Sequence, residues 1–236
     1  MKRRPRTSIM SDYNPESPIA TALRRLYKSV RVQKSVREDY KSFLITSSSR
    51  GEGKSTIAAH LALTIAQFPK KSVLVVDADL RRPQLHRLLG LSNSSGLRDC
   101  LESEVDPMEA VKETALPNLK VITAGPPTDI ASHLFEGDQL RVFFEKAHFY
   151  FDVVLVDSPP VIAVSDTLYL CPLVDTVLFV VLAGETPSGV VTRAKSILDD
   201  AGAEIAGVVV NNALEVLPAY YGHKYYGYHS YGRSED

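Results

Sequence analysis

The chain has 236 residues, of which 44% are hydrophobic and 23% are charged, a composition that is typical of a globular protein and excludes a disordered, fibrous or membrane-bundle chain. The formal net charge of -1 gives no overall reason to expect a nucleic-acid partner. Two cysteines exclude a disulfide framework and predict a reducing compartment. Residues 7–18 are too polar for a signal-peptide core, and no apolar run approaches the about 18 residues of a spanning helix, so we expect a cytoplasmic chain.

Residues 1–41 form a basic segment. Its first 40 residues carry ten Lys and Arg side chains and four acidic ones. This surplus of positive charge can face a membrane surface, another subunit or solvent. We expect an amphipathic helix over residues 19–36, either packed on a neighbouring subunit or solvated along its basic face. The apolar residues that recur there at helical spacing are Ile19, Leu23, Leu26, Tyr27 and Val30.

From residue 42 onward, short runs of branched apolar residues alternate with helical patterns. The runs predict strands over residues 42–47, 72–77, 119–123, 152–157, 176–182 and 205–211. The helical patterns cover residues 54–68, 138–149, 167–171 and 188–201. Several runs are apolar at every position, as in strands buried on both faces. We therefore expect a doubly wound α/β domain over residues 42–212, with a mostly parallel sheet and helices on both faces. The pattern does not place residues 81–118, which hold turn signals and short helical stretches.

A loop of small residues joins the first predicted strand to the first predicted helix of this domain. Gly51 and Gly53 let the backbone approach a phosphate closely. Lys54 can reach terminal phosphates, and the Ser55 hydroxyl can ligate magnesium. The strict phosphate-loop pattern has glycine where this chain has Ser48, so the loop is a variant. A chance Gly-Lys-Ser match is the alternative, but a strand before the loop and a helix after it favour a nucleotide site.

Carboxylates stand at the ends of two buried strands. Asp77 closes one strand and Asp79 follows it, and residues two apart on a strand project to one face. Asp157 closes a second strand. Because these strand ends should lie beside the phosphate loop, the three carboxylates predict a magnesium site. The alternative for each aspartate, and most of all for Asp79, is a helix cap or a turn.

Three further polar residues have no clear assignment. Asp166 suits the cap of the next helix as well as the site. Arg81 and Arg82 follow the aspartate pair and equally suit a solvated surface. The sequence does not separate the two arginines.

Taken together, these motifs resemble the catalytic domain of the bacterial protein-tyrosine kinases (BY-kinases) that accompany capsule and exopolysaccharide export. The resemblance covers nearly the whole chain. It rests on Gly-Glu-Gly-Lys-Ser-Thr at residues 51–56, Val-Val-Asp-Ala-Asp-Leu-Arg at 75–81, Val-Leu-Val-Asp-Ser-Pro-Pro at 154–160, and a terminal tyrosine cluster. It implies a P-loop NTPase-like fold and a tyrosine kinase that uses ATP and Mg²⁺.

The resemblance also implies roles for single residues. Lys54 contacts the nucleotide phosphates, and Asp77 is the candidate base beside Asp79. A base is needed because a tyrosine hydroxyl, with a pKa of about 10, is mostly protonated at neutral pH. The implied metal-binding residues are Ser55, Asp79 and Asp157. The implied nucleotide-binding residues are Ser49, Arg50, Gly51, Glu52, Gly53, Lys54, Ser55, Thr56 and Asn211, although an Asn at a strand end also suits a turn.

The chain departs from the family pattern at two places. The family loop usually has proline where this chain has Arg50, and the related partition ATPases carry an extra lysine where it has Ser49. The family's amino-terminal helix tends to carry a Glu and two Arg for subunit contact, and the matching positions are Thr21, Arg24 and Tyr27. Arg24 alone fits that pattern, so it is the predicted oligomer contact, and a family-like ring is in doubt.

Residues 213–236 form a tail rich in tyrosine and glycine. Glycine favours a flexible tail that presents its tyrosine hydroxyls to the active site of a neighbouring copy. The alternative is a sticky segment without a covalent role. Each phosphate adds about −1.5 to −2 charges, so we expect phosphorylation to loosen self-association. The predicted acceptors are Tyr220, Tyr221, Tyr225, Tyr226, Tyr228 and Tyr231.

The sequence thus predicts a tyrosine autokinase that regulates exopolysaccharide or capsule polymerisation and export. The alternatives are a partition-type ATPase that switches dimerisation or membrane attachment, and an ATP-gated adaptor of a polysaccharide polymerase. The resemblance implies a transmembrane activator or polysaccharide co-polymerase, a cognate tyrosine phosphatase and self-association. The net charge of -1 predicts no nucleic acid as partner. The resemblance also implies a cytoplasmic location at the inner face of the membrane through that activator.

Overall fold

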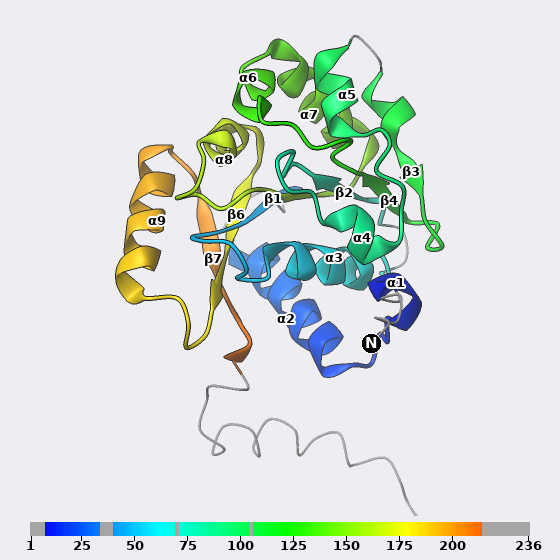
Figure 1. Ribbon diagram of the computed structural model, residues 1–236. Helices are drawn as coiled ribbons and strands as arrows, with labels where there is room; N and C mark the ends of the chain where they lie inside the picture. The colour runs from blue at the N-terminus through cyan, green and yellow to red at the C-terminus, as the bar shows by residue number, and fades with distance from the viewer. Residues whose placement is uncertain (1–7, 34–39, 69–70, 104–105, 214–236) are drawn as a thin grey trace, which may run out of the picture.

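A central sheet of seven strands organises the chain (Figure 1), in a computed structural model that describes residues 8–33, 40–68, 71–103 and 106–213. The strand order is β3-β4-β2-β5-β1-β6-β7. Every neighbouring pair is parallel except β3 with β4. The strands are β1 (Ser42–Ser47), β2 (Val73–Asp77), β3 (Lys112–Glu113), β4 (Leu119–Ile122), β5 (Val153–Asp157), β6 (Thr176–Leu182) and β7 (Ile205–Asn211).

The central strands are buried along their whole length, as their continuous apolar runs predict. Every residue of β1, β2 and β5 is buried. Strands covered on both faces gain from apolar side chains at every position, which explains why β2 and β5 are built mainly from valine. β2 and β5 pair in register, so that Asp77 lies opposite Asp157 at their carboxyl ends.

Helices cover both faces of the sheet, and the sheet separates the hydrophobic core into two layers (Figure 1). One layer lies under α1 (Ile9–Asp12), α2 (Pro18–Gln33), α3 (Lys54–Ile65) and α4 (Leu85–Leu89). The other lies under α5 (Leu97–Glu102), α6 (Ala131–Phe135), α7 (Asp138–Tyr150), α8 (Asp166–Leu170) and α9 (Ser188–Asp200). Two 3₁₀ turns, η1 (Pro107–Ala110) and η2 (Cys171–Leu173), complete the described elements. The doubly wound fold predicted from the sequence is confirmed.

The basic segment contributes α2, which packs against α3. Leu23, Tyr27 and Val30 are buried in this contact layer, at the i, i+4, i+7 spacing of one helix face. Tyr27 stacks edge-on with Phe43 of β1, at 6.2 Å between ring centroids. The apolar face of the helix is therefore used within the chain. Residues 34–36 of the predicted helix lie outside the described residues.

The described part of residues 81–118, which the sequence did not place, includes the strand at one edge of the sheet. It contains α4, α5, η1 and the short antiparallel strand β3, which pairs with β4 through Lys112 and Val121. A two-residue strand carries no periodicity, which explains why the sequence did not predict it. Among the described helices, none has both the length and the apolar character needed to span a membrane.

Candidate functional site

The phosphate loop lies between β1 and α3, at the carboxyl end of the sheet. Gly51 and Gly53 have φ of 85° and 93°, in the left-handed region that favours glycine. A Cβ added to Gly53 would lie 2.1 Å from Asn211 Nδ2, so the loop also needs glycine for space. Lys54 and Ser55 begin α3 and are buried, with their side chains at the helix N-terminus. This arrangement is suited to binding an anion.

Lys54 joins two of the predicted carboxylates. Its Nζ lies 3.1 Å from Asp79 Oδ2 and 3.6 Å from Asp157 Oδ1. Burial alone would lower the pKa of Lys54, but Asp157 and Asp79 outweigh it, so the pKa lies above its usual value. The ammonium group therefore stays charged and neutralises the carboxylates around it.

Asp77 is fully buried behind this pair. Its Oδ2 accepts the backbone N–H groups of Gln84 and Leu85 at 3.0 Å each, and its Oδ1 accepts that of Asp79 at 3.3 Å. Burial raises the pKa of Asp77 well above its ordinary value, and the neighbouring Asp157 carboxylate adds to this. Asp77 thus holds the first turn of α4, the capping role that the sequence left open for these aspartates.

Asp157 offers an acceptor group that suits a cation. Its side chain is fully buried, and neither carboxylate oxygen receives a hydrogen bond within the described residues. Burial raises the pKa of Asp157, and the nearby Lys54 ammonium opposes this rise. Within residues 8–33, 40–68, 71–103 and 106–213, no group of three or more His, Cys, Asp or Glu side chains can hold a metal by itself. The three carboxylates of the predicted magnesium site therefore do not form a metal-binding group by themselves in the described part of the chain.

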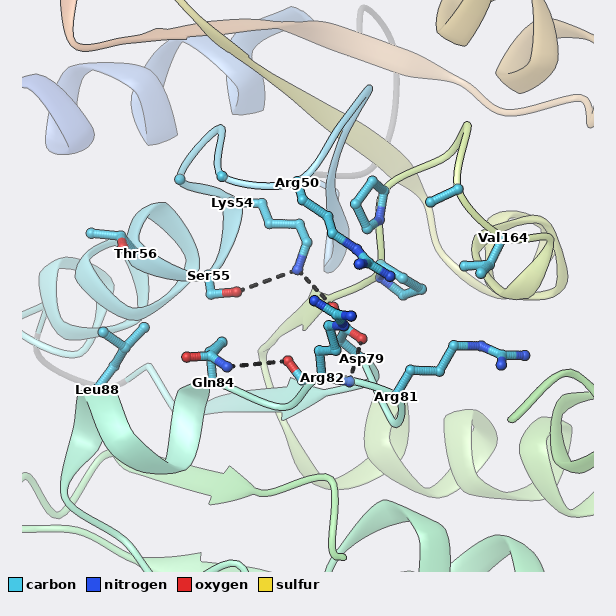
Figure 2. A pocket seen from close by; sticks show the side chains of 15 residues that line it. Arg50, Lys54, Ser55, Thr56, Asp79, Arg81, Arg82, Gln84, Leu88 and Val164 are labelled. Atoms are coloured by element: carbon cyan, nitrogen blue, oxygen red, sulfur yellow. Dashed lines mark hydrogen bonds and ion pairs between the residues drawn. The ribbon is translucent and has the colours of Figure 1, made fainter. Parts of the chain in front are cut away.

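A cleft of about 400 Å³ opens in front of the loop (Figure 2). Asp79 faces it, whereas Asp77 and Asp157 lie behind its wall. The lining residues predicted to bind nucleotide or metal are Arg50, Gly51, Gly53, Lys54, Ser55, Thr56 and Asp79. The other lining residues are Arg81, Arg82, Gln84, Leu88, Pro159, Pro160, Ala163 and Val164.

Three residues that the resemblance implies as nucleotide-binding form hydrogen bonds that hold the phosphate loop. Glu52 is buried, and its carboxylate accepts the Ser49 N–H at 2.7 Å and the hydroxyls of Ser48 and Thr186. The Ser49 N–H is therefore engaged within the protein. Asn211 donates its Nδ2 to the Glu52 carbonyl at 3.0 Å. Glu52, Ser49 and Asn211 lie outside the cleft lining. An acid within a phosphate loop would repel phosphate, and that was the signal in the sequence for a structural role.

The two arginines that the sequence did not separate have different surroundings. Arg81 turns away from the cleft centre (Figure 2) and its Nε lies 2.7 Å from Asp166 Oδ2. It also donates to the Asp129 carbonyl at 2.8 Å and to the Ser132 hydroxyl at 3.1 Å. Arg82 is exposed and makes no side-chain hydrogen bond or ion pair with a described residue. Asp166, the first residue of α8, is therefore the ion-pair partner of Arg81.

The remaining predicted residues lie elsewhere. Arg24 on α2 is half-buried and donates to the Pro15 carbonyl at 2.8 Å, within its own chain. The six tail tyrosines lie outside the described residues.

The loop, the strand order and the carboxylates at the strand ends define a P-loop NTPase. A family model described as "ParA: NUBPL iron-transfer P-loop NTPase" matches residues 40–234, which agrees with the fold.

Relatives narrow the class further. The chain is 34% identical to the tyrosine-protein kinase YwqD of Bacillus subtilis over 204 residues, which cover 85% of each protein. The kinase domain of the Escherichia coli tyrosine kinase ETK superposes with a TM-score of 0.81 at 30% identity, covering 89% of this chain and 82% of that one. Full-length Etk of E. coli K12 is 34% identical, and the matched part is 28% of its length. The chain belongs to the bacterial tyrosine-protein kinases.

Proposed function

We propose that this kinase transfers the terminal phosphate of ATP to the tyrosine cluster of its own tail, and that the acceptor tail comes from a neighbouring copy. The observation that carries the proposal is the ion-pair cluster at the phosphate loop. In it, Lys54 Nζ lies 3.1 Å from Asp79 Oδ2 and 3.6 Å from Asp157 Oδ1. The tail supplies six tyrosines within 12 residues of the chain, Tyr220 to Tyr231.

Each residue at the loop has a task in this reaction. Backbone N–H groups of the loop and the Lys54 ammonium bind the phosphates and stabilise the charge that develops during transfer. Ser55 and Asp157, with Asp79 beside them, are the oxygen ligands available to Mg²⁺, which when bound supplies further positive charge on the phosphates.

The transfer needs a proton acceptor. The tyrosine oxygen forms a bond to the terminal phosphorus, the bond from that phosphorus to the bridging oxygen breaks, and ADP leaves with that oxygen. The phenolic proton goes to a carboxylate. Asp79 is favoured because its side chain lines the cleft, whereas Asp77 is fully buried and does not. The Asp79 oxygens accept from Lys54 Nζ at 3.1 Å and from the Arg82 N–H at 3.0 Å. Asp77, the candidate from the family resemblance, remains the second candidate.

A polysaccharide export system is the setting that the family resemblance supports. There a transmembrane activator or co-polymerase would bind the kinase at the inner face of the membrane, and a tyrosine phosphatase would reset the tail. The longer relative, of which this chain matches 28%, has room for such a partner within one polypeptide.

The central experiment maps phosphate by mass spectrometry after incubation with ATP and Mg²⁺. Phosphate on the six tail tyrosines supports the proposal. Release of phosphate to water alone favours the partition-type ATPase, and no turnover favours the adaptor. Mixing an Asp79→Asn chain with a chain whose tail tyrosines are all phenylalanine tests transfer between copies: phosphate must then appear on the Asp79→Asn chain. Size measurement before and after modification tests whether phosphorylation loosens self-association.

A further inference from the structure

Positive charge at the cleft exceeds what the protein itself neutralises. Four lining side chains are cationic, namely Arg50, Lys54, Arg81 and Arg82, and Asp79 is the anionic one. Lys54 is paired with Asp79 and Asp157, and Arg81 with Asp166. Arg50 and Arg82 have neither an ion pair nor a side-chain hydrogen bond with a described residue, and both are exposed.

These two guanidinium groups reach into the same cleft from different segments. Figure 2 shows Arg50 extending from the phosphate loop and Arg82 rising from the segment after β2, with their side chains pointing toward each other. Like charges that converge without a counter-ion repel each other, and an anion between them removes that cost. Two guanidinium groups also present several N–H donors, which suits a phosphate better than a single carboxylate.

The tail has a sequence that matches such a site. Its tyrosines include the adjacent pairs Tyr220-Tyr221 and Tyr225-Tyr226. From residue 220 to residue 231 the tail has no Asp or Glu, but it has Lys224. This stretch therefore gains an anion when one of its own tyrosines is phosphorylated. In an extended chain adjacent side chains project to opposite sides, so one ring can approach the Lys54–Asp79 pair while its neighbour stays at the exposed guanidinium groups of Arg50 and Arg82.

We propose that Arg50 and Arg82 bind a phosphotyrosine next to the tyrosine being modified, so that phosphorylation of one member of a pair promotes phosphorylation of the other. The inference rests on the proposed function and names the form of the acceptor that the site prefers. The reaction itself is unchanged: the acceptor oxygen takes the terminal phosphate of ATP, and ADP leaves. A phosphate held by two arginines through charge-assisted hydrogen bonds should improve acceptor binding by about tenfold to a hundredfold.

The test uses the full chain with its six tail tyrosines replaced by phenylalanine, so that added peptides are the acceptors. The peptides span residues 222–230 with Tyr228→Phe, which leaves Tyr225 as the acceptor. Position 226 is phosphotyrosine in the first peptide, phenylalanine in the second and glutamate in the third. The readout is the ratio of kcat/KM between the first and second peptides, together with the KM for ATP.

The expected ratio is about ten or more. In Arg82→Gln, and independently in Arg50→Gln, the ratio should fall toward one. The matched control Arg87→Gln removes an exposed arginine of α4 that does not line the cleft, and it should keep the ratio.

Several results would overturn the inference. A ratio near one in the parent chain shows that the neighbouring phosphate has no effect. If the glutamate peptide has the same kcat/KM as the phosphotyrosine peptide, the two arginines bind carboxylates as well as phosphate, and the site is not specific for phosphotyrosine. An Arg82→Gln chain with an unchanged ratio and a raised KM for ATP assigns the guanidinium to the nucleotide. If the parent phosphorylates all peptides equally, the inference fails alone, whereas no phosphorylation of any peptide also contradicts the proposed function.

Discussion

Lys54 Nζ lies 3.1 Å from Asp79 Oδ2, and this contact joins the phosphate loop to the end of β2. Both side chains are nearly buried, with exposures of 11% and 7%. Asp157 ends the neighbouring strand β5, and its Oδ1 lies 3.6 Å from the same ammonium group. One lysine thus carries the charge balance of two strand ends and a loop.

Replacing Lys54 with methionine should therefore affect both chemistry and stability. We expect tyrosine phosphorylation to fall by at least about 10²-fold, because the charge on the phosphates is lost. We also expect the free energy of unfolding to fall by about 2–4 kcal/mol, because two buried carboxylates lose their cation. Urea unfolding and phosphotyrosine labelling measure the two effects.

Lys41→Met is the matched control for this change, since Lys41 is exposed. It should alter the free energy of unfolding by no more than about 0.5 kcal/mol. Full stability of Lys54→Met would show that the ammonium group does not neutralise the carboxylates in the folded chain.

The pH dependence of stability should show the buried Asp77. Its pKa is raised by burial, so the folded chain keeps this proton at pH values at which the unfolded chain has lost it. The folded state then binds more protons, and the free energy of unfolding falls as pH rises from about 4 through the raised pKa. Asp77→Asn should weaken this fall, because the asparagine carries no charge and its side-chain oxygen can still accept from α4. Urea unfolding over a pH series measures the slope.

Asp152 provides a control of opposite sign. Hydrogen bonds from Ser72, first the backbone and then the side chain, lower the pKa of Asp152. This contribution is present above the unfolded pKa of about 4 and is lost as pH falls through the lowered value. Asp152→Asn should change stability on the acid side and leave the slope at higher pH intact. The same pH profile for both variants would refute the assignment to Asp77.

Replacing Arg81 and replacing the neighbouring Arg82 should have different effects on the free energy of unfolding. Arg81→Gln leaves the Asp166 carboxylate, which is 1% exposed, without its ion pair. We expect a loss of about 2–3 kcal/mol in the free energy of unfolding, reduced because the Arg81 side chain is 24% exposed. Arg82→Gln should change it by less than about 0.5 kcal/mol. Equal losses in urea unfolding would contradict the difference between the two positions.

Glu52 should act through the shape of the phosphate loop. Glu52→Ala removes the acceptor for the Ser49 N–H and the hydroxyls of Ser48 and Thr186. We expect the Kd for ATP to rise by about tenfold, since buried donors left unpaired cost about 1–3 kcal/mol and loosen the loop. Thr186→Val should have a smaller effect. The double variant should then lose less than the two separate losses combined, because both changes remove one shared contact. Additive losses would exclude that coupling.

The doubly wound fold, the phosphate loop and the strand-end positions of Asp77, Asp79 and Asp157 could be predicted from the sequence. These features are local: a valine run buried on both faces, a glycine with positive φ, and a carboxylate at the end of a strand each leave a pattern within a few residues. Parallel pairing then brings the strand ends to one edge, which allowed the cluster to be expected before it was seen.

Which polar groups face the cleft could not be predicted in this way, because it depends on contacts between distant parts of the chain. Arg81 and Arg82 are adjacent and chemically identical, yet Asp166, 85 residues from Arg81, pairs with one of them. Glu52 belongs to the loop, yet its partner Thr186 is 134 residues away. Such pairs form through long-range packing, and a charge finds its counter-charge in space rather than along the chain.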